Sequence, residues 1–222
     1  MTRVAILHTH PATVEPLTAV AAEVLPGVEL IHVVDATIYA DLQRTGGLLD
    51  SMATRLVSAA QQGAQAGADA ILSACSSIGE FVPQAQAAVA VPVVRIDAAM
   101  AAAAVRRGSV IGIAATLAST LAPTTRLLQA AADEAGRAVT LQPVLISGAF
   151  ERLTAGDRAG HDALLVAALS ELAQRSDVVV LAQVSMARVL PALAEADRAK
   201  CLTSPRLGLE AVRAALVAGV AA

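Results

Sequence analysis

The sequence predicts an α/β fold made of two pseudo-symmetric Rossmann-like units with parallel sheets. Short apolar runs alternate with segments of helical spacing along all 222 residues, which is typical of parallel strands joined by helices. Hydrophobic residues make up 56% of the chain and aromatic residues 1%, so the core must be closely packed Ala, Val, Leu and Ile. In addition, the order of strands, turns and helices repeats after about 107 residues.

The first half of the chain is expected to alternate strands and helices. Strands are predicted at 3–9, 28–35, 70–74 and 91–97, and helices at 14–24, 48–65, 78–88 and 98–106. The strands are nearly continuous apolar runs, as in a sheet covered on both faces, and the helices have apolar residues three and four positions apart. The segment 35–47, which contains Tyr39, is predicted to be a polar loop or a short helix.

The second half repeats this order. Strands are predicted at 109–115, 139–146, 178–182 and 201–205, and helices at 121–135, 161–175, from 186 onwards and at 207–217. The segment 148–160 is predicted to be a polar connection, and Cys201 to be a core residue of the last strand.

Matched residues indicate that the two halves arose by duplication. At a shift of 107, Thr9, Thr13 and Pro16 match Thr116, Thr120 and Pro123; at a shift of 108, Asp69, Ser77 and Pro83 match Asp177, Ser185 and Pro191. We predict a first unit at 1–97, a second unit at 98–205, and a closing helix at 206–222 that packs back onto the first unit. Ligands of open α/β sheets bind at the carboxyl ends of the strands, so a ligand cleft is expected between the two units.

Composition excludes several classes of protein. A net charge of −3 and a pI near 5.8 provide no basic surface, so neither nucleic acid nor membrane is an expected partner. No apolar run is long enough to span a bilayer, and the N-terminus lacks the anatomy of a signal peptide. Two cysteines do not make a disulfide framework. We therefore expect a cytoplasmic protein, with homo-oligomer formation left open.

Cys75 is the leading candidate for chemistry. It ends the apolar run 68–75, and Ser76 and Ser77 open the next helix. Backbone N–H groups and the positive end of a helix dipole favour an anion at such a point. A cysteine at the end of a strand can also be mere packing, but the two serines favour a site for a carboxylate.

The turns after the first strand of each half supply further candidates. Thr9 and Thr116 are predicted to donate hydroxyls to a substrate, whereas Thr13 and Thr120 are better explained as helix N-caps. His8 and His10 could share a face, but no further ligand follows at metal spacing, so no metal is expected. Either histidine could act as a general acid or base, although a capped or solvated loop histidine is the plainer interpretation of each.

These turns resemble those of the aspartate/glutamate/hydantoin racemase superfamily along essentially the whole chain. The resemblance rests on the segments 74–77, 115–120, 181–187 and 202–205. It implies two α/β domains, no cofactor, and two thiols that flank the α-carbon of a small carboxylate substrate. The substrate-binding positions it implies are Thr9, Ser76, Ser77, Thr116, Ser119, Val184 and Ser185.

The position of the second thiol is occupied by Gln183 in this sequence. An amide forms hydrogen bonds but does not carry a proton near neutral pH, so a symmetric two-thiol racemase is disfavoured. The first hypothesis is a cofactor-independent isomerase in which Cys75 works with His10 or His8, and Gln183 contacts the substrate. The second is a decarboxylase resembling arylmalonate decarboxylases, although their single thiol lies in the other half. The third is a non-catalytic protein that binds small carboxylates.

Overall fold

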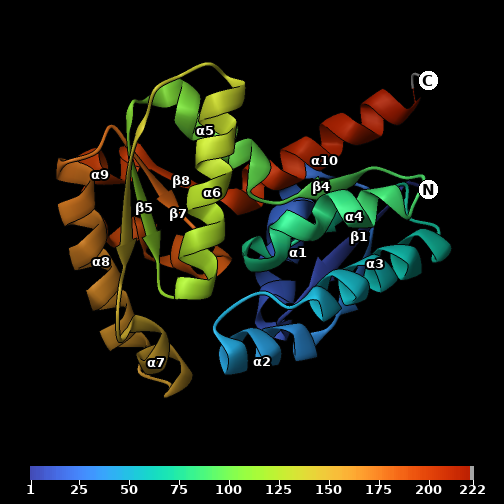
Figure 1. Cartoon of the computed structure of the whole chain (residues 1–222), viewed down its shortest axis with the longest axis horizontal. Coiled ribbons are helices and arrows are strands. Elements are labelled where there is room, and N and C mark those ends of the chain that lie inside the picture. Colours follow the sequence, from blue (N-terminus) through green and yellow to red (C-terminus); the bar gives the residue numbers. More distant parts are fainter. Residues whose placement is uncertain (221–222) are drawn as a thin grey trace. The chain divides into compact units, whose positions relative to one another are not determined.

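The computed structural model, which describes residues 1–220, confirms the α/β fold with two four-stranded parallel sheets. The chain divides into one unit of Met1–Ala99 with Pro205–Ala222 and a second of Met100–Ser204. The strand order is β2-β1-β3-β4 in the first sheet and β6-β5-β7-β8 in the second, so the two sheets have the same topology (Figure 1). The last two positions of the predicted closing helix, 221 and 222, lie outside the described residues.

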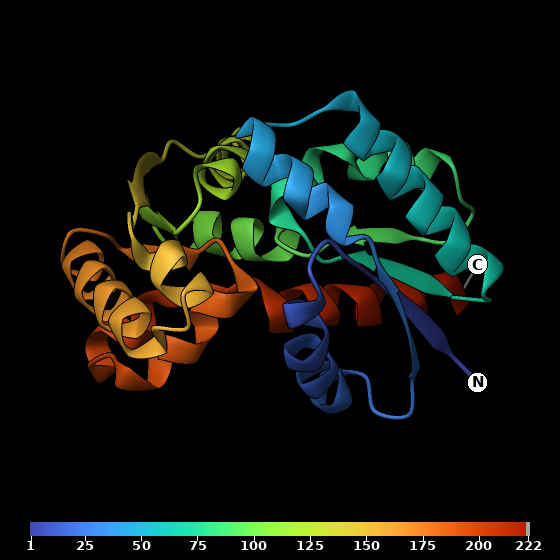
Figure 2. The same cartoon turned by 90° about the horizontal axis from the view of Figure 1, so that it is seen from below.

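The first unit alternates strands with helices on both faces of its sheet. Its elements are β1 (Arg3–His8), η1 (Pro11–Thr13), α1 (Val14–Val24), β2 (Glu29–Val34), α2 (Ala36–Thr45), α3 (Asp50–Gln65), β3 (Ala70–Ser73), η2 (Ser76–Phe81), α4 (Val82–Ala87), β4 (Val93–Arg95) and α10 (Ser204–Val220), where η marks a 3-10 helix. Figure 2 shows α1 and α3 on opposite sides of β1. Alternate residues of β1 therefore enter two different apolar layers.

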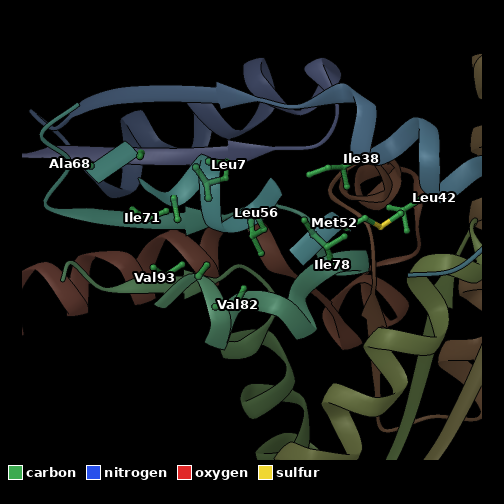
Figure 3. Close-up of a cluster of buried hydrophobic side chains, with 14 residues drawn as sticks. Leu7, Ile38, Leu42, Met52, Leu56, Ala68, Ile71, Ile78, Val82 and Val93 are labelled. Atoms are coloured by element: carbon green, nitrogen blue, oxygen red, sulfur yellow. The ribbon is translucent and has the colours of Figure 1, made fainter. Parts of the chain in front are cut away.

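One of these layers supports the end of β3. Ala5 and Leu7 of β1 pack with Ile71, with residues of α2, α3 and α4, and with Ile78 of η2 (Figure 3). Cys75 is half-buried against the same cluster. The apolar packing thus fixes the turn that carries the thiol.

The second unit repeats the arrangement. After α5 (Ala98–Arg107) it contains β5 (Val110–Ala115), α6 (Ala118–Glu134), β6 (Thr140–Leu145), α7 (Ala149–Thr154), α8 (Arg158–Gln174), β7 (Val178–Leu181), η3 (Val184–Ala192), α9 (Glu195–Lys200) and β8 (Cys201–Thr203). Ala114, α8, β7 and η3 form its own apolar cluster, against which the half-buried Cys201 packs. Burial is the main reason that the pKa of the Cys201 thiol rises to about 11.

A matched pair of aspartates makes the same contact in both units. Asp69 Oδ2 accepts the N–H of Arg3 at 2.8 Å, and Asp177 Oδ2 accepts the N–H of Val110 at 2.8 Å. Each aspartate thereby ties the start of its unit's third strand to the start of the first. The repeat seen in the sequence is therefore a repeat of contacts as well as of elements.

The helices that follow β3 and β7 differ from the prediction. A helix was expected at 78–88, but the chain turns at Ser76 as a 3-10 helix and becomes α-helical only at Val82. Pro83 has no N–H to bond the carbonyl four residues earlier, and the N–H of Val82 bonds the carbonyl of Gly79 instead. The helix predicted from 186 likewise begins at Val184 as the 3-10 helix η3, with Pro191 inside it.

Short helices form in the polar segments, and at 35–47 the structure has the short helix, one of the two predicted alternatives. The segment 35–47 forms α2, because the Asp35 carboxylate accepts the N–H of Thr37 and Gly46 ends the helix at a φ of 67°. The predicted connection at 148–160 contains α7, and α9 was not predicted at all. No helix among the described residues is both long and apolar enough to cross a membrane.

Candidate active site

Cys75 lies directly after the central strand β3, at the carboxyl edge of the first sheet. The N–H of Ala74 bonds the carbonyl of Leu7 at 3.0 Å, which extends the pairing of β3 with β1 to the turn. Cys75 then adopts the extended backbone of an N-cap residue, with φ −120° and ψ 110°. Its sulfur is consequently presented to the first turn of η2.

Three donors address the sulfur of Cys75. They are the Thr9 hydroxyl and the backbone N–H groups of Ile78 and Ser77, and all three act to lower the pKa of the thiol. Burial has the larger effect and raises the pKa above its usual value, and the Asp97 carboxylate adds to the rise. Cys75 therefore rests as a neutral thiol near pH 7, in a turn already equipped to hold its thiolate.

Tyr39 is a site residue that the sequence argument missed. Burial, and next the charge on Cys75, raise the pKa of its phenol to about 12. Its ring meets the ring of His10 edge-on, with centroids 5.0 Å apart. Tyr39 is the sole tyrosine in the chain, and its position in a helix after β2 was the available signal. The phenol remains protonated and can donate a hydrogen bond near the thiol.

His10 is exposed and caps the 3-10 helix η1. Its Nδ1 accepts the N–H of Ala12 at 3.1 Å, so the neutral ring carries its proton on Nε2. In this geometry His10 is a hydrogen-bond donor at Nε2. It can take up a second proton only when its bond to Ala12 breaks.

His8, offered above as an alternative acid or base, is unsuited to that role. It is buried, and its two ring nitrogens lie 2.8 Å from Thr13 Oγ1 and 2.9 Å from Nδ1 of His32. Burial, and next the neighbouring His32, lower the pKa of His8 to about 4. The Thr13 hydroxyl donates to the carbonyl of His10 at 2.8 Å, so His8 Nδ1 must donate to Thr13. His8 is therefore a neutral, buried residue that supports the turn through its contacts with Thr13 and His32.

Gln183 occupies in the second unit the place that Cys75 has in the first. It follows β7 and is the N-cap of η3. Its Oε1 accepts the N–H of Thr116 at 2.6 Å and the Thr116 hydroxyl at 3.0 Å. These bonds assign the amide orientation and direct the NH₂ group away from Thr116. Gln183 is thus a fixed donor where the repeat would place a second thiol.

The other predicted site residues are distributed over both units. Ser76 and Ser77 are buried in the first turn of η2, and Val184 and Ser185 begin η3. Ser119 and Thr120 lie in the first turn of α6, whose N-cap is Leu117, so the prediction of Thr120 as an N-cap was wrong. Thr13 is the N-cap residue of α1, but its hydroxyl bonds His10 and His8 instead of capping the helix.

The described residues contain no cluster of three or more His, Cys, Asp or Glu that could hold a metal ion. The first unit presents a thiol, a phenol and hydroxyl and N–H donors, and the second presents a fixed amide. The groups of the first unit suit proton transfer at carbon and the binding of an oxyanion.

Comparison with known proteins identifies the family of the chain. Residues 9–212 match the family described as Asp/Glu/Hydantoin racemase, and the chain belongs to that family. Among curated protein sequences, none matches this chain.

Solved structures share the fold at low sequence identity. A glutamate racemase from Bacillus anthracis has a TM-score of 0.74 and 14% identity, over 98% of this chain and 82% of that one. An allantoin racemase from Klebsiella pneumoniae has a TM-score of 0.68 and 21% identity, over 99% and 89%. A mutant of arylmalonate decarboxylase has a TM-score of 0.63 and 17% identity, over 96% and 93%.

Proposed function

We propose that the protein is a cofactor-independent isomerase of the racemase type that moves a proton at the α-carbon of a small carboxylate through one thiol, Cys75. The observation that carries the proposal is the set of three donors around the sulfur of Cys75. A thiolate held by such donors is a base, and the same group is an acid once it is protonated.

The Cys75 thiol first releases its proton to solvent, and the thiolate so formed takes the α-proton, while the C–H electron pair moves onto the substrate carboxylate to give an enediolate. The hydroxyls of Ser76 and Ser77 are the proposed donors to the substrate oxygens. For inversion, a protonated His10 that has released Ala12 returns a proton from Nε2 to the carbon. Exchange with solvent then restores both groups.

The substrate is proposed to carry a single carboxylate. Arg95 and Arg188 stand on elements next to the two turns, and each already pairs with an acidic side chain: Arg95 Nε lies 2.6 Å from Asp97 and Arg188 Nη2 lies 3.1 Å from Asp162. At the Cys75 turn, a second anionic group on the substrate would have to displace the pair of Arg95 with Asp97.

The test is proton exchange in D₂O on a panel of α-substituted monocarboxylates, followed by NMR and chiral analysis. Deuterium should enter at the α-carbon with the native protein, and the Cys75→Ser variant should lower the rate at least about a hundredfold, because a general acid–base group contributes that much or more. Cys201→Ser, which changes a cysteine in the other unit, is the matched control and should retain the rate.

His10→Asn separates exchange from inversion. Asn can accept the Ala12 N–H in place of Nδ1 but does not titrate. The proposal expects this variant to exchange deuterium without inverting the α-carbon. Inversion at the native rate would remove His10 from the mechanism, and exchange that survives Cys75→Ser would overturn the proposal as a whole.

A decarboxylase is the second candidate, and the neutral resting thiol favours it. Loss of CO₂ from a substituted malonate generates the carbanion without a base, and the Cys75 thiol then needs only to donate its proton. CO₂ release from an arylmalonate that is abolished by Cys75→Ser, with no exchange into monocarboxylates, would select this candidate. Binding without either reaction would select a carboxylate-binding protein.

A further inference from the structure

A buried ion pair lies at the end of β4. Arg95 Nε is 2.6 Å from Asp97 Oδ1, and Arg95 Nη2 is 3.1 Å from Asp97 Oδ2. The Asp97 side chain is fully buried and that of Arg95 is 13% exposed. Replacing such a pair by apolar residues is often neutral or stabilising, so stability alone does not account for it.

The strand register places this pair beside the thiol. β3 and β4 are parallel, with Ser73 opposite Arg95, and the N–H of Ile96 bonds the carbonyl of Ser73 at 3.1 Å. Two residues further along each strand, Cys75 and Asp97 are neighbours at the carboxyl edge of the sheet. The carboxylate of Asp97 accordingly acts against ionisation of Cys75.

The guanidinium of Arg95 also contacts the helix that faces the thiol. A Cβ added at Gly79 would overlap the Nε and Cζ atoms of Arg95, so the guanidinium lies directly on the backbone of η2 at this glycine. The same helix supplies the N–H groups of Ser77 and Ile78 to the sulfur of Cys75. Arg95 therefore contacts both the acid beside the thiol and, at Gly79, the helix whose first residues supply the N–H donors.

We infer that Arg95 and Asp97 form a positioning pair in which Arg95 balances the Asp97 charge beside Cys75 and holds η2 against the sulfur. Neither residue needs to touch the substrate. Asp97 fixes the guanidinium by its two bonds, and the guanidinium keeps the carboxylate from acting as an uncompensated anion next to the thiol.

The other titratable groups around Cys75 do not supply this balance. Tyr39 of α2 stays neutral because its pKa is about 12. His10 faces Tyr39 from the turn after β1, and its Nδ1 is engaged by Ala12. Glu80, on η2 itself, is a further acid. Among these groups only Arg95 brings a fixed positive charge to the first turn.

The test measures the apparent pKa of the Cys75 thiol in the full-length chain. In a Cys201→Ser background, the rate of alkylation of Cys75 by iodoacetamide is followed from pH 6 to pH 11 and gives the apparent pKa. Arg95→Gln should raise this pKa by about one unit, which is about a tenfold slower reaction at neutral pH. Asp97→Asn should move the pKa in the opposite direction. Arg95→Lys retains the charge and should stay nearer the native value than Arg95→Gln.

If Arg95→Gln and Asp97→Asn shift the pKa of Cys75 in the same direction, the inference is wrong. Equal pKa values of Cys75 in Arg95→Gln and Arg95→Lys would also overturn it. If circular dichroism shows that Asp97→Asn does not fold, the two Arg95 variants decide between the outcomes. The double variant Arg95→Gln/Asp97→Asn buries no unpaired charge, so the pKa of Cys75 should be lower in it than in Arg95→Gln. The inference draws its functional meaning from the proposed role of Cys75, but alkylation is measured without substrate, so failure of the turnover assay leaves this test intact.

Discussion

Thr9 and Thr116 are matched residues that serve different partners. The Thr9 hydroxyl donates to the sulfur of Cys75, whereas the hydroxyl and N–H of Thr116 both donate to Gln183 Oε1. The donors at the carboxyl edge are thus kept in both units, while the acceptor changes from a thiol to an amide. The residue at this position, Cys75 in the first unit and Gln183 in the second, therefore determines whether the edge of the sheet has a group that can donate and accept a proton.

Thr9→Val should raise the pKa of Cys75. The substitution preserves the shape of the side chain and removes a donor that favours the thiolate, so the charged form becomes less stable and the pKa rises. We expect a rise of about one unit in the pH dependence of alkylation, as each unit corresponds to about 1.4 kcal/mol of lost thiolate stabilisation. Thr116→Val is the matched control in the second unit, and in this variant the pKa of Cys75 should equal that of the native protein. An unchanged pKa in Thr9→Val would show that the hydroxyl does not serve the sulfur.

At the scale of elements, the turn between β1 and η1 depends on a neutral histidine. His8 connects Thr13 to His32, and Nε2 of His32 lies 3.2 Å from the hydroxyl of Thr18 on α1. Burial also lowers the pKa of His32. These side-chain contacts connect β1, β2 and α1 beneath the turn that carries Thr9 and His10.

This turn should make the protein sensitive to acid. The pKa of His8 falls from 6.5 to about 4 on folding, so the unfolded chain binds more protons between these pH values. The contribution of neutral His8 is complete above pH 6.5 and is lost as the pH falls towards 4. Urea unfolding should therefore give a free energy lower by about 2 kcal/mol at pH 4.5 than at pH 7 from this residue alone.

His8→Gln is the variant that tests the assignment. It removes the titrating group, so it should weaken the pH dependence between pH 7 and pH 4.5 even if it destabilises the protein at pH 7. His10→Asn, which alters the exposed histidine two residues later, should retain the native slope. A slope in His8→Gln as steep as the native one would assign the acid sensitivity to other groups.

At the scale of the whole molecule, the first unit is discontinuous in sequence. It is completed by α10, in which Leu209 and Val212 are fully buried. Gly208 approaches the backbone of Ile96 so closely that a Cβ would lie 3.1 Å from its Cα. The last helix therefore packs directly behind β4, the strand that carries Arg95 and leads to Asp97.

Leu209→Ala should lower the free energy of unfolding by about 2–5 kcal/mol, because it removes a fully buried side chain and leaves a cavity. Val217→Ala on the same helix is the matched control. Val217 is 68% exposed, and its truncation should change stability by no more than about 0.5 kcal/mol. Equal effects of the two substitutions in urea unfolding would contradict the packing of α10.

The elements that could be predicted were those with continuous apolar signals. The strands were found at or within a few residues of their true bounds. The inner strands β1, β3, β5 and β7 are buried and leave apolar runs in the sequence. The helices α7 and α9 were missed, since short polar helices are stabilised by caps and tertiary contacts that leave little periodicity. The 3-10 helix Ser76–Phe81 after Cys75 was not predicted, because its apolar spacing does not distinguish a 3-10 helix from an α-helix.

The sequence by itself determined the repeated α/β fold, the place of Cys75 just after a strand and the matched position of Gln183 in the second half. Periodicity and matched positions suffice for these, because they are properties of neighbouring residues along the chain. Only the tertiary structure showed that Tyr39 contacts His10 and that His8 is buried between Thr13 and His32. It also showed that Arg95 and Asp97 lie beside the thiol. These contacts join residues from different strands and helices, and which of them meet depends on strand register and helix packing.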